Sequence, residues 1–374
     1  MTHPSRDARM CRLLCMRTPA RRFGLILPLL LLALSAACSP VYVIRAGLHE
    51  ARILSRRRPI ARVIEDPATA PAVRHKLDVV LQARAYAEHS LDLAAGDSYT
   101  TYSWVSHDTL LMVVTASRPD RFQAHTWWFP VVGRVPYKGY FDFEKAYADA
   151  AKLREQGLDT YVRPSGAFST LGWFNDPLLS TILRYGDVSL ATTVVHEILH
   201  NTVYIPSQVA FNESFASFVG DRGAIDFLCA RDGESAPTCD LAKRNWHDTL
   251  LYGAFLSDLV HRLEAVYRRE DLTTAAKLTQ KVALLAAAKV RFSAEVEPSL
   301  QTTGYRGFLN QEVNNATLIG VRLYYERLEV FERVYERYGG DLPRATRAMI
   351  DAAKASPSDP YGAMERLVQA TPRQ

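Results

Sequence analysis

Residues 188–205 constrain this chain more than any other segment of its 374 residues. The stretch reads VSLATTVVHEILHNTVYI, and only three of its side chains carry charge near neutral pH: His196, Glu197 and His200. Such an apolar run, followed by Pro206, predicts a buried helix. Burying ionisable groups without partners costs on the order of several kcal/mol, so we expect the protein to supply a partner for them.

The spacing of these groups indicates a metal ion as that partner. His196 and His200 are four positions apart, which places both imidazoles on one face of a helix. Glu197 is rotated by roughly 100° about the helix axis, so it reaches a water at the ion rather than the ion itself. This is the His-Glu-x-x-His arrangement of zinc proteases. A buried helix with internally satisfied histidines is the alternative interpretation.

A third ligand follows in the sequence. Glu213 lies in a segment with phenylalanines at helical spacing, and Pro206 allows a turn before it, so Glu213 can face the histidines across a helical hairpin. Two His and one Glu form the ligand set of thermolysin-like enzymes. We predict one Zn²⁺ per chain on His196, His200 and Glu213, although Co²⁺ and Mn²⁺ suit the same ligands. Three ligands favour a catalytic site over a structural one.

Longer stretches carry a family resemblance. Asn-Glu-x-x-Ala at 212–216 resembles the third-ligand helix of the gluzincin clan of metallopeptidases. The predicted zinc helix and several other segments are similar to the putative aminopeptidase family of bacterial lipoproteins, over roughly residues 40–350; these segments are 56–60, 135–141, 165–177, 210–216 and 314–316. The resemblance implies a lipoprotein with a zincin-type fold and peptidase activity.

The motif and the resemblance together assign catalytic roles. Glu197 is the expected general base, which takes a proton from water and passes it to the leaving amine. An oxyanion is often stabilised by Tyr or His. Tyr324 matches a tyrosine of the family pattern, on a helix expected to begin at residues 314–316. Tyr325, Tyr305 and His247 compete with it for this role.

One position departs from thermolysin. Where that enzyme has an Asp four residues after its Glu ligand, this chain has Ser217. Metal-binding histidines usually donate their second ring nitrogen to a carboxylate or carbonyl. Asp221 and Asp187 are two candidates for such a carboxylate, and the sequence does not rank them.

The N-terminus reads as an export signal. Basic residues precede the apolar run 23–34, and small residues follow up to Cys38, as in a secretory signal at 1–37. The small residues before Cys38 resemble a bacterial lipoprotein signal, which implies lipidation of Cys38, and Ser39 after it favours the periplasmic side of the outer membrane. The net charge of +5 resides in this segment, with six Arg and one Asp, so the charge gives no case for nucleic acid.

Two cysteines remain beyond Cys38 after export. Cys229 and Cys239 flank a loop-like stretch that contains Gly and Pro. In an oxidising periplasm we expect them to form a disulfide. Two unrelated thiols are the alternative.

The remaining sequence indicates an α+β fold, a mainly helical zincin with a small sheet before the zinc helix. Strands are expected at Leu110–Thr115, Thr126–Val132 and Leu158–Arg163, and helices at Phe143–Glu155, Leu272–Ala288 and Leu318–Tyr338. We expect a signal peptide at 1–37, a membrane-proximal tether at 38–60, a catalytic domain at 61–240 and a helical part at 241–374 that completes the cleft.

The leading hypothesis is a lipid-anchored zinc metallopeptidase that acts on peptides in the periplasm as an aminopeptidase. An aminopeptidase must hold the free amine of its substrate, and no Gly-x-Met-Glu-Asn exopeptidase motif is present. An endopeptidase for envelope proteins or peptidoglycan stem peptides stays open. So does a non-catalytic envelope assembly factor with a zinc-bound binding domain, although a binder does not need Glu197.

Overall fold

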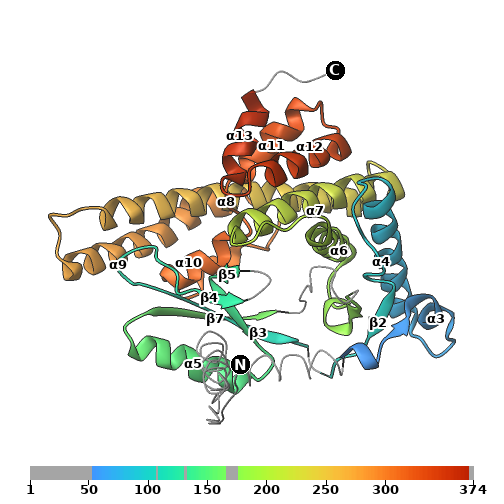
Figure 1. Cartoon of the computed structure of the whole chain (residues 1–374), viewed down its shortest axis with the longest axis horizontal. Coiled ribbons are helices and arrows are strands. Elements are labelled where there is room, and N and C mark those ends of the chain that lie inside the picture. Colours follow the sequence, from blue (N-terminus) through green and yellow to red (C-terminus); the bar gives the residue numbers. More distant parts are fainter. Residues whose placement is uncertain (1–52, 107, 130–132, 166–175, 370–374) are drawn as a thin grey trace, which may run out of the picture. The chain divides into compact units, whose positions relative to one another are not determined.

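The computed structural model describes residues 53–106, 108–129, 133–165 and 176–369. Helices predominate among them, together with three small sheets of two or three strands (Figure 1). This confirms the predicted α+β, mainly helical class. None of the described helices combines the length and apolar character of a membrane span.

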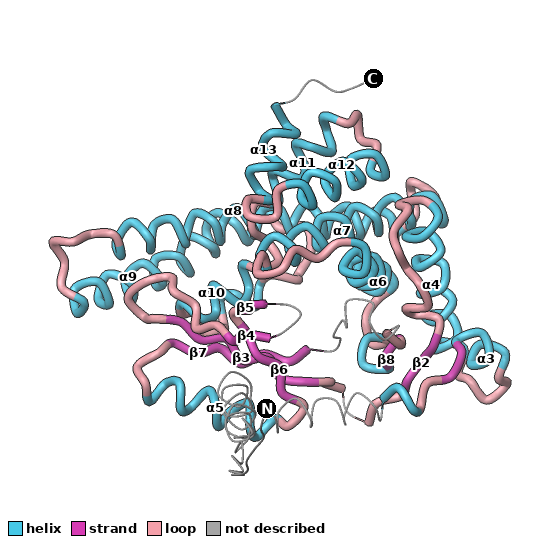
Figure 2. Tube along the Cα trace, in the orientation of Figure 1, coloured by secondary structure: helices cyan, strands magenta, loops and turns pink. Residues whose placement is uncertain are grey.

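The central sheet has the strand order β6-β3-β7, and both pairs are antiparallel (Figure 2). Its middle strand is buried at every position, because α5 packs on one face and α10 on the other. The predicted strands at 110–115 and 158–163 are confirmed within two residues at each end. These elements are β3 (Leu111–Ser117), β6 (Tyr137–Tyr140), β7 (Asp159–Ser165), α5 (Phe143–Glu155) and α10 (Asn315–Arg322).

Two smaller sheets complete the β structure. One has the order β1-β2-β8, and the other is the antiparallel pair β4-β5. β4 lies within the strand expected at 126–132, of which residues 130–132 fall outside the described ranges. Their bounds are β1 (Arg58–Pro59), β2 (Thr101–Ser103), β4 (Trp127–Phe129), β5 (Gly133–Val135) and β8 (Leu178–Leu179).

The helices α6 (Asp187–Thr202) and α7 (Val209–Asp232) lie within the largest hydrophobic core. The phenylalanines of α7 are buried, as their helical spacing predicts, and the rings of Phe211, Phe215 and Phe218 pack against Phe331. The helix α6 ends at Thr202, a few residues before Pro206. α3 (Ile60–Glu65) and α4 (Pro71–His89) precede this pair, and α4 packs against α6.

The C-terminal half is helical, as expected. The long helix α8 (Pro237–Tyr267) packs against α7 and α9 (Thr274–Arg291), and α9 confirms the helix predicted at 272–288. Three further helices pack on one another and on α7 (Figure 1): α11 (Leu328–Arg337), α12 (Leu342–Ala355) and α13 (Pro360–Gln369). The boundary near residue 240 stays a prediction.

The continuous helix expected over Leu318–Tyr338 is wrong. α10 ends at Arg322, a turn follows, and α11 begins at Leu328 after Arg327, whose φ of 53° is left-handed. Adjacent residues of a helix point about 100° apart. In the turn, Tyr324 and Tyr325 instead both line one cleft. Tyr324 therefore lies just beyond α10 rather than on the helix.

Candidate metal centre

The helices α6 and α7 run antiparallel in close contact. Thr192 Oγ1 donates to Asp221 Oδ1 at 3.3 Å near one end, and Glu213 meets the histidines near the other. Gly220 lies at a close contact between the helices: a Cβ there would stand 2.9 Å from the carbonyl oxygen of Thr192 and 3.1 Å from His196 Cβ. The missing side chain lets α7 come near enough for Glu213 to reach α6.

The three predicted ligands converge on one point. The Nε2 atoms of His196 and His200 are 3.2 Å apart. Glu213 Oε2 lies 3.5 Å from Nε2 of His196 and 3.8 Å from Nε2 of His200. All three side chains are largely buried, with 13%, 6% and 12% of the surface exposed for His196, His200 and Glu213. These residues form a group that can hold a metal ion.

The donor set and its spacing fit zinc. Ligands at about 2.0–2.2 Å from a tetrahedral ion stand about 3.3–3.5 Å apart, close to the three distances here. Two imidazole nitrogens and one carboxylate oxygen suit zinc chemically. Cys229, Glu234 and Cys239 also lie near one another. The two cysteines form a disulfide between the end of α7 and the start of α8, so that group is not a metal site.

Electrostatic interactions with the two histidines shift the pKa of Glu213, and Glu213 in turn shifts the pKa of His200. Burial raises the pKa of Glu213, but hydrogen bonds and charge from His196 and His200 outweigh it and lower the pKa well below its usual value. Burial lowers the pKa of His200, but the hydrogen bond and charge of Glu213 outweigh it and raise the pKa. The carboxylate is therefore ionised at neutral pH, as a ligand must be.

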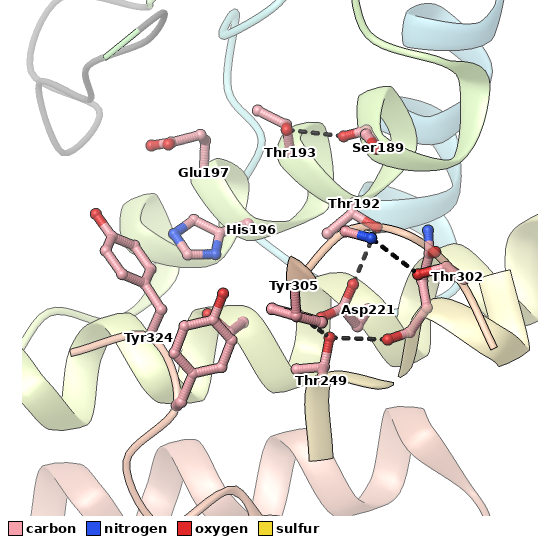
Figure 3. Close-up of a pocket in the computed structure, with 14 residues that line it drawn as sticks. Ser189, Thr192, Thr193, His196, Glu197, Asp221, Thr249, Thr302, Tyr305 and Tyr324 are labelled. Carbon is pink, nitrogen blue, oxygen red and sulfur yellow. Dashed lines mark hydrogen bonds between the residues drawn. The ribbon is translucent and has the colours of Figure 1, made fainter. Parts of the chain in front are cut away.

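One member of the group, His196, lines a cleft of about 520 Å³. His196 and Glu197 lie on its wall, and Figure 3 shows the Glu197 carboxylate pointing away from the imidazole of His196. Glu197 is therefore beside the ligands without being one, as the helix geometry predicts. Burial raises the pKa of Glu197, while the charges of His196 and His200 act in the opposite direction.

Comparison with known proteins places this arrangement in a family. The sequence model described as "Putative aminopeptidase" matches residues 41–360. The chain belongs to this family. No curated protein and no solved structure matches it. Membership of the Putative aminopeptidase family indicates peptidase activity, and a metal-binding group beside a buried glutamate in a cleft is consistent with it.

In this member of the Putative aminopeptidase family, Tyr324 is the candidate oxyanion residue that lies against the metal group. Its ring stacks on the imidazole of His196, with centroids 6.2 Å apart. Its hydroxyl accepts a hydrogen bond from Arg163 Nη2 at 3.0 Å. Burial raises the pKa of Tyr324 to about 12, although Arg163 acts to lower it. The phenol is therefore protonated at neutral pH.

Arg163 is a site residue that the sequence did not reveal. It lies on β7, opposite Val113 in the register, and its guanidinium carbon is 5.5 Å from the Tyr324 ring centroid. A charged residue in a short strand resembles many surface positions, so no sequence signal distinguishes it. Its contact with Tyr324 depends on how the sheet packs against the turn after α10.

The other candidates for the oxyanion role have different neighbours. Tyr305 and Tyr325 line the cleft, but the Tyr305 hydroxyl is 2.8 Å from Thr249 Oγ1, and the two tyrosines also pack on each other. His247 Nδ1 is 3.1 Å from Asp248 and does not line the cleft. Tyr324 is the one of the four whose ring stacks on a predicted ligand.

The structure separates the two carboxylates proposed to orient a histidine. Asp187 Oδ2 is 2.7 Å from His75 Nε2, away from the cleft lining. Asp221 lines the cleft near His196, and its hydrogen-bond partner among the described residues is Thr192. Neither carboxylate is hydrogen-bonded to a predicted metal ligand in the described part of the chain.

The predicted signal at 1–37 and Cys38 lie outside the described residues.

Proposed function

We propose that the protein is a zinc-dependent aminopeptidase, anchored by lipid on Cys38 to the periplasmic side of the outer membrane. One observation supports the proposal most: His196, His200 and Glu213 converge within ligand distance of one point, with Glu197 beside them in a cleft. The N-terminal sequence supports the location, with a basic and apolar leader that ends in small residues and Cys38.

In this proposal the three ligands hold zinc, and the remaining residues carry the proton chemistry. When bound, zinc polarises a carbonyl oxygen and lowers the pKa of water at its open position. Glu197 accepts the proton of the attacking water and delivers it to the leaving amine. Burial favours a carboxylate that can take up and release a proton.

Tyr324 is the proposed donor to the oxyanion. Its oxygen accepts from Arg163, a residue that has no acceptor to offer in return. The single phenol proton is thus free to point into the cleft, where negative charge develops on the former carbonyl oxygen. Arg163 holds the hydroxyl in place, and its charge strengthens the phenol as a donor.

The test uses the mature lipoprotein purified in detergent, with Glu197→Gln as the matched variant. We measure zinc content and hydrolysis of a peptide with a free N-terminus and of the same peptide N-acetylated. The proposal expects about one zinc per chain in both proteins, hydrolysis of the free peptide by the wild type, and turnover about 10²–10⁴-fold lower in the variant.

Each other result points to a different function. Cleavage of the acetylated peptide would indicate an endopeptidase. A protein that binds zinc but hydrolyses neither peptide would indicate an envelope assembly factor, if the Glu197→Gln variant also preserves the cellular phenotype. A wild-type protein without zinc would contradict the proposal.

A further inference from the structure

Asp221 is a carboxylate on the cleft wall that forms no ion pair with the described residues. It and Glu197 are the two carboxylates among the described cleft-lining residues. The hydroxyl of Thr192 donates to Asp221 at 3.3 Å, and no Lys, Arg or His nitrogen of the described residues forms an ion pair with it. A partly buried carboxylate without a cation leaves most of its acceptor capacity for a ligand.

Asp221 lies beside the metal group. Its partner Thr192 comes four residues, a rise of about 6 Å, before the ligand His196 on α6, and the charge of His196 acts on the Asp221 carboxylate. In a peptide, the α-amino nitrogen is two bonds from the first carbonyl carbon, about 2.5 Å away. An amine anchor must therefore lie close to the scissile carbonyl, and Asp221 shares the cleft that His196 and Glu197 line.

The lining around Asp221 is rich in oxygen. Ser217, Asn245, Thr249 and Thr302 line the same cleft. Figure 3 shows Thr192, Asp221, Thr249 and Thr302 grouped on one side of the view, and Glu197 with Tyr324 on the other. An ammonium group has three donors and no acceptor, so hydroxyl and carboxylate oxygens suit it.

We propose that Asp221 binds the α-ammonium group of the substrate's first residue and so makes the enzyme an exopeptidase. This inference rests on the proposed function and supplies the amine anchor for which the sequence has no Gly-x-Met-Glu-Asn motif. Burial raises the pKa of Asp221 to about 6, although the hydrogen bond from Thr192 and the charge of His196 act to lower it. A bound ammonium group would add a positive charge and favour the ionised carboxylate.

The test measures binding as well as turnover. Leucine hydroxamate and N-acetyl-leucine hydroxamate are titrated by calorimetry into the zinc-loaded full-length protein, its Asp221→Asn variant and an Asp187→Asn control, with zinc content measured for each. Asp187 is a matched control because it lies on the same helix hairpin but outside the cleft lining. If Asp221→Asn fails to fold, Asp221→Ser replaces it.

We expect the wild type and Asp187→Asn to bind the free-amine probe at least about 30-fold more tightly than the acetylated probe. Asp221→Asn should lose this preference while keeping its zinc and its affinity for the acetylated probe. Failure of the wild type to bind or to discriminate the probes, a preference that survives in Asp221→Asn, or loss of zinc from that variant would overturn the assignment. Because the probes need no hydrolysis, the binding result stands apart from the peptidase test.

Discussion

The two sides of the cleft are built differently. The metal side comes from two consecutive helices, and its three ligands fall within residues 196–213. The rest of the site, here called the composite side, comes from distant segments: Arg163 from β7, Thr249 from α8, Thr302 from the loop after Ser299, and Tyr324 from the turn after α10. The first side depends on one helix–helix contact, and the second depends on the packing of four distant segments.

This difference separates holding a metal from recognising a substrate. A rigid helical hairpin fixes ligand geometry with few residues, which metal coordination requires. In a cleft wall built from several segments, single residues can be substituted while the structure of the helical hairpin stays the same. We therefore expect changes at the three ligands to remove the ion, and changes on the composite side to alter rate and specificity with the ion retained.

The largest effect is expected from Glu213→Ala. It removes one of three ligands and leaves two buried histidines without their carboxylate, so zinc affinity should fall more than about 100-fold and activity should be lost. Competition with a chromogenic chelator measures the affinity, and Glu197→Gln is the control that keeps zinc. A Glu213→Ala protein with wild-type zinc affinity would remove the distinction between the two sides.

On the composite side, Tyr324→Phe should lower kcat by about 10²–10³-fold with zinc content unchanged, because one oxyanion donor is lost. Arg163→Met should act through the same hydroxyl, so the double variant should be little worse than Tyr324→Phe alone. Steady-state kinetics of the wild type, the two single variants and the double variant complete a double-mutant cycle. Tyr305→Phe, at another cleft tyrosine, serves as the control. Additive losses would show that Arg163 does not act through Tyr324.

Gly220→Ala tests the helix contact that supports the metal side. Alanine favours an ordinary helix by about 1 kcal/mol, but here its Cβ would lie 2.9 Å from the Thr192 carbonyl oxygen. We expect a net loss of about 1–3 kcal/mol in the free energy of unfolding, together with weaker zinc binding. Urea denaturation measures the first quantity. Gly307→Ala, where a Cβ meets nothing within 4 Å, is the matched control and should change neither.

The smallest effect concerns stability rather than rate. Burial raises the pKa of Asp221 to about 6, above its usual 3.8, so its ionisation destabilises the folded protein as pH rises from about 4 to 6. In metal-free protein at pH 7–8, Asp221→Asn should therefore increase the free energy of unfolding, by at most about 3 kcal/mol. The gain should vanish below about pH 4, where both states hold the proton. A gain independent of pH would point to a packing effect instead.

The sequence revealed the metal side because its signals are local. Residues four apart share a helix face, so His196 and His200 could be paired without a structure, and the phenylalanines around Glu213 indicated the second helix. The α+β class and the helix at 143–155 followed from periodicity in the same way. Local patterns of this kind carry both the ligand set and the main elements.

The composite side follows from packing that no local pattern encodes. The break between α10 and α11 was missed because residues 318–338 stay amphipathic across a turn that a left-handed Arg327 permits. Arg163 meets Tyr324 across 161 positions of sequence. The sequence offered Asp221 only as one of two candidate carboxylates. Its place on the cleft wall, beside Thr192, depends on how α6 and α7 pack.

The most direct test of the central claim is metal reconstitution. The mature protein is stripped with a chelator, and peptide hydrolysis is measured as zinc is added in steps. The account predicts no activity in the stripped protein and a linear recovery that saturates at one zinc per chain, with no recovery in Glu213→Ala. Full hydrolysis by the metal-free protein, or equal recovery in Glu213→Ala, would contradict it.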